Sequence, residues 1–133
     1  MRSIAVVSRK GGVGKSTSAV HLSAGLAAAG RRVLLIDVDT QGHCSVMLGV
    51  EPSSGLGSVI LGRVPMEDAI CPVHDRLDLL AGGRDLSGTD RYIMTLKAGQ
   101  ERVLSRALAD IGRSDSILVT LPVCFLERSR CMA

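Results

Sequence analysis

Aromatic side chains are nearly absent from this sequence of 133 residues, which has one Tyr, one Phe and no Trp. A hydrophobic core must therefore be built from Leu, Ile, Val and Ala, as is common in buried parallel sheets. The shortage also argues against a protein that binds single-stranded nucleic acid by stacking bases on aromatic rings. Hydrophobic residues make up 46% of the chain, so we expect a folded protein and not a disordered one.

Long apolar runs and blocks of basic residues are also missing. No stretch approaches the roughly 18 apolar residues of a spanning helix, and the apolar run before Arg9 and Lys10 is too short for a signal peptide. We therefore expect a cytoplasmic protein without a membrane partner. The net charge of +3 is too small to indicate nucleic-acid binding by itself.

The four cysteines, Cys44, Cys71, Cys124 and Cys131, form no C-x-x-C pair and have no His at metal-binding spacing. Free or buried thiols are the expected state in a cytoplasmic chain. We predict neither a zinc site nor an iron–sulfur cluster.

A glycine-rich stretch, R-K-G-G-V-G-K-S-T at residues 9–17, lies between a short apolar run and a helix-like segment. Glycines allow successive N–H groups to turn toward an anion, and the start of a helix adds further donors and a positive dipole end. Lys15 would reach the β- and γ-phosphates, and the Ser16 hydroxyl would coordinate Mg²⁺. The predicted phosphate-binding residues are Gly11, Gly12, Val13, Gly14, Lys15, Ser16 and Thr17. A glycine-rich turn that binds nothing is disfavoured, because lysine, hydroxyls, glycines and flanking elements are all present.

The elements around this stretch form a βαβ pattern. We predict strands at Ser3–Val7 and Val33–Asp37, joined by a helix at Ser16–Ala29 that ends at Gly30. The two strands should be parallel, with a right-handed crossover. Because open parallel sheets bind ligands at the carboxyl ends of their strands, the glycine-rich stretch and Asp39 should lie at the same edge.

Asp37 ends this second predicted strand, and Asp39 follows two residues later. In the functional interpretation Asp39 lies near the attacking water or the magnesium shell. In the alternative both carboxylates cap the next turn. Gln41 and Gly42 are expected in a loop, and His43 is expected to be an exposed polar residue.

The rest of the chain has a coarser pattern. It predicts two short helices around residues 56–60 and 66–70, a strand at 77–80, a helical segment at 85–96, an amphipathic helix at 101–111 and a final strand at 117–121. We therefore expect an α/β fold with a mainly parallel sheet and flanking helices.

K-G-G-V-G-K-S-T resembles the deviant Walker A motif of the ParA/MinD family of P-loop ATPases. The stretch L-L-I-D-V-D-T-Q-G-H at residues 34–43 is similar to the second motif of the partitioning branch, D-x-D-[PT]-Q-G. The resemblance implies a P-loop NTPase that binds ATP and Mg²⁺ and hydrolyses ATP. It assigns catalytic roles to Lys10, Lys15 and Asp39, with Lys10 reaching the partner's nucleotide in an ATP-dependent homodimer and Thr17 contacting the α-phosphate.

By the same resemblance, the partners would be a ParB-like centromere-binding protein and, in full-length relatives, nonspecific DNA of the nucleoid. A MinD-like membrane switch needs a C-terminal amphipathic helix, and the sequence of residues 123–133 does not predict one.

The family pattern is incomplete in two respects. Thr120 stands where the family has the Walker B carboxylate, although the surrounding strand matches. Residues 1–122 resemble only the N-terminal part of a ParA-like ATPase domain, and residues 123–133 form a tail without family character. A truncated, non-hydrolysing nucleotide-binding fragment or pseudogene product is therefore the alternative to an active ATPase. We expect the P-loop strand of such a fragment to lie at an exposed sheet edge.

Overall fold

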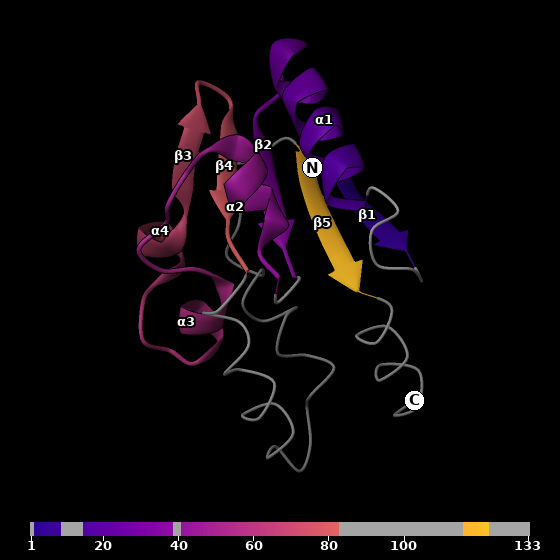
Figure 1. Cartoon of the computed structure of the whole chain (residues 1–133). Coiled ribbons are helices and arrows are strands. Elements are labelled where there is room, and N and C mark those ends of the chain that lie inside the picture. Colours follow the sequence, from indigo (N-terminus) through magenta and orange to yellow (C-terminus); the bar gives the residue numbers. More distant parts are fainter. Residues whose placement is uncertain (1, 9–14, 39–40, 83–115, 123–133) are drawn as a thin grey trace.

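The computed structural model of the chain describes residues 2–8, 15–38, 41–82 and 116–122. Five strands and four helices lie in these ranges (Figure 1). In chain order they are β1 (Arg2–Ser8), α1 (Lys15–Ala28), β2 (Val33–Asp37), α2 (His43–Leu48), α3 (Leu56–Ile60), α4 (Met66–Ala69), β3 (Cys71–His74), β4 (Leu77–Leu80) and β5 (Ser116–Pro122).

The strands form one mixed sheet in the order β1-β5-β2-β4-β3. Strands β1, β5, β2 and β4 are parallel, and β3 pairs antiparallel with β4 through a hairpin. The predicted, mainly parallel sheet is thus confirmed. β1 and β2 are parallel, as the βαβ pattern predicts, but β5 lies between them. Within the described residues β1 is the edge strand, as expected for the P-loop strand.

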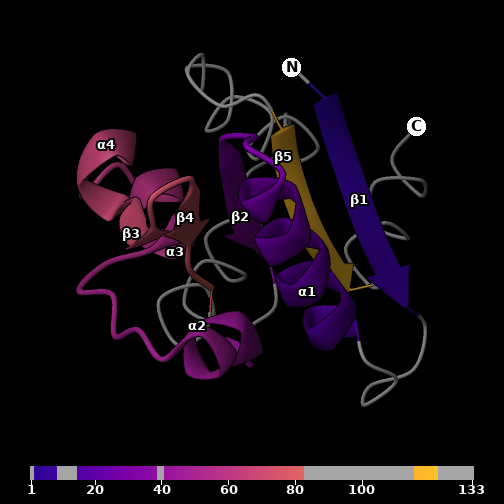
Figure 2. The same ribbon diagram turned by 90° about the horizontal axis from the view of Figure 1, so that it is seen from above.

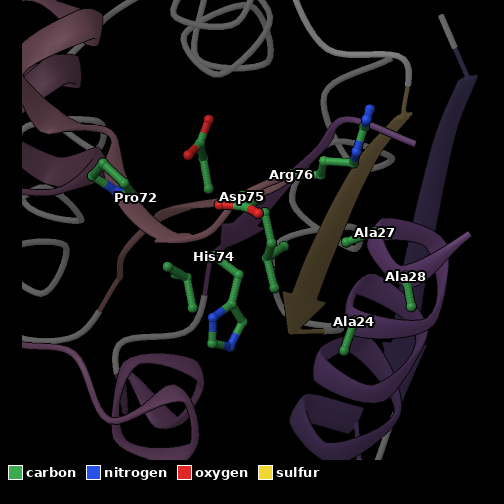
Figure 3. Close-up of a pocket in the computed structure, with 10 residues that line it drawn as sticks. Ala24, Ala27, Ala28, Pro72, His74, Asp75 and Arg76 are labelled. Carbon is green, nitrogen blue, oxygen red and sulfur yellow. The ribbon is translucent and has the colours of Figure 1, made fainter. Parts of the chain in front are cut away.

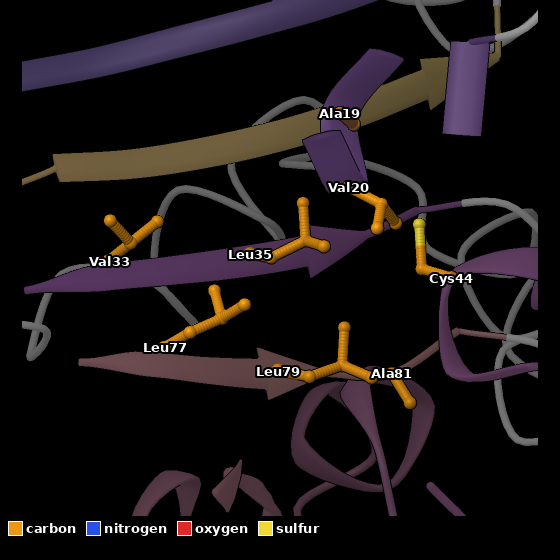
Figure 4. Packing of buried hydrophobic residues seen from close by; sticks show 8 residues of the cluster. All are labelled: Ala19, Val20, Val33, Leu35, Cys44, Leu77, Leu79 and Ala81. Atoms are coloured by element: carbon orange, nitrogen blue, oxygen red, sulfur yellow. The ribbon is translucent and has the colours of Figure 1, made fainter. Parts of the chain in front are cut away.

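The core lies on both faces of the sheet because β2 is buried along its whole length. Val33 and Leu35 point to the face that α1 and α2 cover, where they pack with Ala19, Val20, Cys44, Leu77, Leu79 and Ala81 (Figures 2 and 4). Leu34 and Ile36 point to the opposite face, where Leu56 of α3 and Ala69 of α4 pack against them. A continuous apolar strand such as V-L-L-I is typical of this two-sided burial.

Helix α1 ends as its sequence predicts. Gly30 has φ +89°, a backbone conformation that residues with a Cβ adopt only under strain. The N–H of Gly30 donates to the carbonyl of Ala27 at 3.0 Å, and the N–H of Arg31 donates to that of Leu26 at 3.1 Å. These bonds form a Schellman motif, which satisfies carbonyls of the last helical turn.

Most of the predicted elements in the described ranges are confirmed, including the two short helices and the strands at 77–80 and 117–121. Helix α2 and strand β3 were not predicted. The first is a six-residue helix between Gly42 and Gly49, and the second contains Pro72, which suits only an edge strand. The predicted segments at 85–96, 101–111 and 123–133 lie outside the described residues.

Candidate functional site

Three parallel strands end at the same edge of the sheet. The register aligns Val6 of β1 with Thr120 of β5, and Thr120 with Asp37 of β2. Strand β1 ends at Ser8, and helix α1 begins at Lys15. The glycine-rich segment therefore connects the carboxyl end of a parallel strand to the start of a helix. That is the position in which open α/β sheets bind phosphates.

The predicted phosphate-binding residues fall partly within the described ranges. Lys15 opens α1, the Ser16 side chain is buried with 8% of its surface exposed, and Thr17 is exposed. Lys10, Gly11, Gly12, Val13 and Gly14 lie outside the described residues. The first turn of a helix has N–H groups without intrahelical acceptors, so the start of α1 can donate to an anion. The roles of these side chains stay predictions.

Asp37 is the last residue of β2 and is completely buried. Its Oδ2 accepts a hydrogen bond from the backbone N–H of Cys44 at 3.4 Å. Cys44 is the second residue of α2, so the Asp37 carboxylate satisfies a donor in the first turn of that helix. This contact agrees with the capping alternative for Asp37. Asp39 lies outside the described residues, and the choice between the two interpretations stays a prediction.

His43 and two of the four cysteines lie within the described residues. His43 is exposed. Cys44 is buried and Cys71 is partly buried, and neither sulfur is part of a disulfide. Cys124 and Cys131 lie outside the described residues. Within the described ranges no three His, Cys, Asp or Glu side chains gather as metal ligands would.

Thr120 is placed by the strand register. It lies beside Asp37 on one side and beside Val6 on the other. The position that the family resemblance assigns to the Walker B carboxylate is thus at the ligand-binding edge of the sheet. A Thr here supplies no charge to a hydrated Mg²⁺, which prefers carboxylates, phosphates and water.

A separate pocket of about 930 Å³ lies at the other end of the strands, away from the end where the glycine-rich segment follows β1 (Figure 3). It is lined by the second half of α1, through Ala24, Ala27 and Ala28, and by the β3–β4 hairpin. Arg76 of the hairpin donates from Nη1 to the carbonyl of Gly30 at 3.0 Å. The pocket faces the amino ends of the parallel strands, so it is not the phosphate site. No sequence pattern indicates it.

The described helices include none that is both long and apolar enough to cross a lipid bilayer. The expected absence of a membrane partner stays a prediction.

The fold, and a glycine-rich sequence that joins the end of β1 to the start of α1, define an α/β domain of the P-loop NTPase class. A family model for an AAA domain (AAA_31) matches residues 1–123. The chain belongs to this family, and its relatives identify it as a ParA-type member.

Two partitioning proteins illustrate the similarity. The chromosome partitioning protein ParA of Caulobacter vibrioides is 43% identical over 94 residues, which cover 68% of this chain and 35% of that protein. The chromosome-partitioning ATPase Soj of Thermus thermophilus is 40% identical over 122 residues, which cover 92% of this chain and 46% of that protein. The chain thus spans less than half the length of these relatives.

A solved structure shows the same arrangement. The cobyrinic acid a,c-diamide synthase of Mycobacterium smegmatis, with bound ADP and magnesium, superposes with a TM-score of 0.83 at 35% identity. The match covers 92% of this chain and 51% of that one. The expected P-loop NTPase fold is therefore confirmed, and the chain corresponds to about half of it.

Proposed function

We propose that this chain binds Mg·ATP at the junction between β1 and α1. The main support is the position of this junction, which lies at the edge of the sheet where β1, β5 and β2 end together. The chain also belongs to a P-loop ATPase family. The backbone of residues 11–14 and the Lys15 ammonium hold the phosphates, Ser16 coordinates Mg²⁺ and Thr17 contacts the α-phosphate. The buried Ser16 side chain at the start of α1 supports its role.

We further propose that the chain belongs to a partitioning ATPase of the ParA/Soj type. Asp39 aids attack of water on the γ-phosphate, and Lys10 acts across an ATP-dependent homodimer. The assembly cycles on nonspecific DNA and responds to a ParB-like centromere-binding protein. The similarity to ParA and Soj supports this proposal. Residues 1–122 would form the ATPase part and residues 123–133 a tail outside it.

The second candidate is a nucleotide-binding protein that does not hydrolyse ATP. It is favoured by Thr120, which lies beside Asp37 at the ligand-binding edge. Without a carboxylate at this position, the water molecules around Mg²⁺ have one charged acceptor fewer. Hydrolysis depends on Mg²⁺ to stabilise the charge of the phosphates, so it would be slowed.

Calorimetric titration with Mg·ATP and phosphate-release kinetics test both candidates. We expect wild type to bind Mg·ATP and Lys15→Ala to lose binding. Phosphate release by wild type that Lys15→Ala abolishes supports the ATPase. Binding without release, with release appearing in Thr120→Asp, supports the non-hydrolysing candidate. Equal binding by wild type and Lys15→Ala would contradict the proposed site.

A further inference from the structure

Helices α1 and α2 lie side by side on one face of the sheet (Figure 2), and both expose large apolar side chains. Val46 of α2 is 76% exposed and its neighbour Met47 is 42% exposed, while Leu22 of α1 is 41% exposed. These three are the exposed large hydrophobic residues of the described ranges. Scattered residues of this kind are ordinary, but their concentration on one face is typical of a surface that binds another molecule.

The pocket between α1 and the β3–β4 hairpin lies on the same face. Val73 lines this pocket and packs against the same core cluster as Leu48, the last residue of α2. The α1 side of the pocket is a wall of methyl groups that includes the exposed Ala24 and Ala28 (Figure 3). Such small side chains leave room for larger apolar ones. The face therefore carries both an apolar pair that protrudes, Val46 and Met47, and an apolar wall that can receive one.

The charges beside these two features are opposite. The Arg76 guanidinium donates to the carbonyl of Gly30 at 3.0 Å, and the exposed Arg31 directly follows that glycine. Two guanidinium groups thus belong to the end of the pocket where α1 stops. Glu51 is exposed and follows α2 by three residues. Among the residues that the structure describes, neither Arg31 nor Glu51 has an ion-pair partner.

Two acidic residues also line the pocket, but they do not reverse its charge. Asp78 alternates along β4 with Leu77 and Leu79, which pack on the α1 side, so its side chain is directed to the opposite face of the sheet. Asp75 lies in the hairpin turn directly before Arg76. The carboxylate of Asp75 is therefore offset by its neighbour, and Arg31 leaves this end of the pocket positive.

We propose that this face binds a second copy of the chain around a two-fold axis. The apolar pair of each copy packs against the alanine wall of the other, and Glu51 of each copy meets Arg31 of the other. Because the apolar pair and the pocket share one face, a two-fold axis that passes between them forms both contacts twice. This dimer needs no nucleotide, and it goes beyond the proposed function.

The spacing of the residues permits both contacts at once. Ala24 precedes Arg31 by seven residues, which is about 10 Å along a helix. Val46 precedes Glu51 by two helical and three non-helical steps, so the two lie at most about 13 Å apart. An apolar contact and an ion pair at these separations match on the two surfaces.

Analytical ultracentrifugation of the chain without nucleotide tests the proposal. Wild type should pass from monomer to dimer as its concentration rises. Val46→Asp places a charge in the apolar contact, and the fold should tolerate it because the position is exposed in the monomer. The contact occurs twice in the dimer, so we expect the dissociation constant to rise at least roughly 30-fold. A wild type that is still monomeric at about 1 mM would overturn the proposal.

A charge exchange tests the ion pair. Arg31→Glu or Glu51→Arg alone brings like charges together, and each should raise the dissociation constant at least about 10-fold. The double variant restores the pair with its charges exchanged, and it should recover most of the wild-type affinity. Glu67→Arg is the matched control, because it makes the same change at an exposed position of α4, on the opposite face. Failure of the double variant to recover, or equal weakening by Glu67→Arg, would contradict the proposed contact.

The same measurements separate this dimer from the ATP-dependent homodimer of the proposed function. A dimer that forms without nucleotide and is weakened by Val46→Asp supports this inference, even if the chain binds no ATP. A dimer that forms only with Mg·ATP and is unaffected by Val46→Asp belongs to the proposed function and overturns this inference. A nucleotide-free dimer that none of these variants weakens uses another surface, which also overturns it.

Discussion

Two glycines, one inside α1 and one just after it, should respond to the same substitution with opposite signs. Gly25 lies inside the helix, and a Cβ added to it meets no atom within 4 Å. Ala is favoured over Gly inside a helix by about 1 kcal/mol. Gly25→Ala should therefore raise the free energy of unfolding by about that amount.

Gly30 follows the same helix, and a Cβ added to it would also meet nothing within 4 Å. Its φ of +89° is nevertheless unfavourable for an L-residue, at a cost of about 1–2 kcal/mol. Gly30→Ala should therefore lower the free energy of unfolding by that amount. Because neither added Cβ meets another atom, the difference between the two variants reports the backbone conformation alone.

Urea unfolding of the two variants measures this difference. Together the effects amount to about 2–3 kcal/mol, or roughly a 30- to 150-fold difference in the unfolding equilibrium constant. The midpoints should move in opposite directions with an unchanged slope. A shift of both midpoints in the same direction would refute the assignment of Gly30 as the residue that ends α1.

Two further predictions concern the core and an acidic side chain. Leu35 is completely buried, so Leu35→Ala should destabilise the fold by about 2–5 kcal/mol, whereas Leu22→Ala, at a position that is 41% exposed, should cost less than about 0.5 kcal/mol in the same urea assay. Burial raises the pKa of the Asp78 carboxyl by desolvation. Its ionised form therefore weakens the fold as pH rises through the folded-state pKa, and Asp78→Asn should raise the urea midpoint at neutral pH. The gain should vanish below about pH 3.9, the ordinary pKa of Asp, where wild type is also protonated. Equal costs for the two Leu variants, or a gain from Asp78→Asn that persists at low pH, would contradict these assignments.

The elements that the sequence predicts best carry their own local signals. β2 is a continuous apolar run that ends in a carboxylate, and α1 stops at a glycine with positive φ. α2 lacks such a signal, because it is short and its capping acceptor is Asp37 on the neighbouring strand. The hairpin partner of β4 is equally hard to predict, since β3 depends on pairing and contains Pro72.

The candidate site divides in the same way. Motif spacing predicts the glycine-rich segment at the junction of β1 and α1, and the structure has a strand end and a helix start there. The insertion of β5 between β1 and β2 is a tertiary arrangement that no local pattern reveals. This insertion brings Thr120 beside Asp37. The Thr at position 120, which departs from the Walker B motif, can therefore be tested as a residue of the ligand-binding edge.

The most direct test of the proposed nucleotide site is to map Mg·ATP binding by NMR on the labelled chain. We expect amide shifts to change in residues 9–17 and at Asp37 and Cys44, near the carboxyl ends of β1 and β2. The pocket between α1 and the β3–β4 hairpin should be unaffected, including Ala24 and Arg76. Changes centred on that pocket, or no change at residues 9–17 at saturating Mg·ATP, would contradict the proposed site.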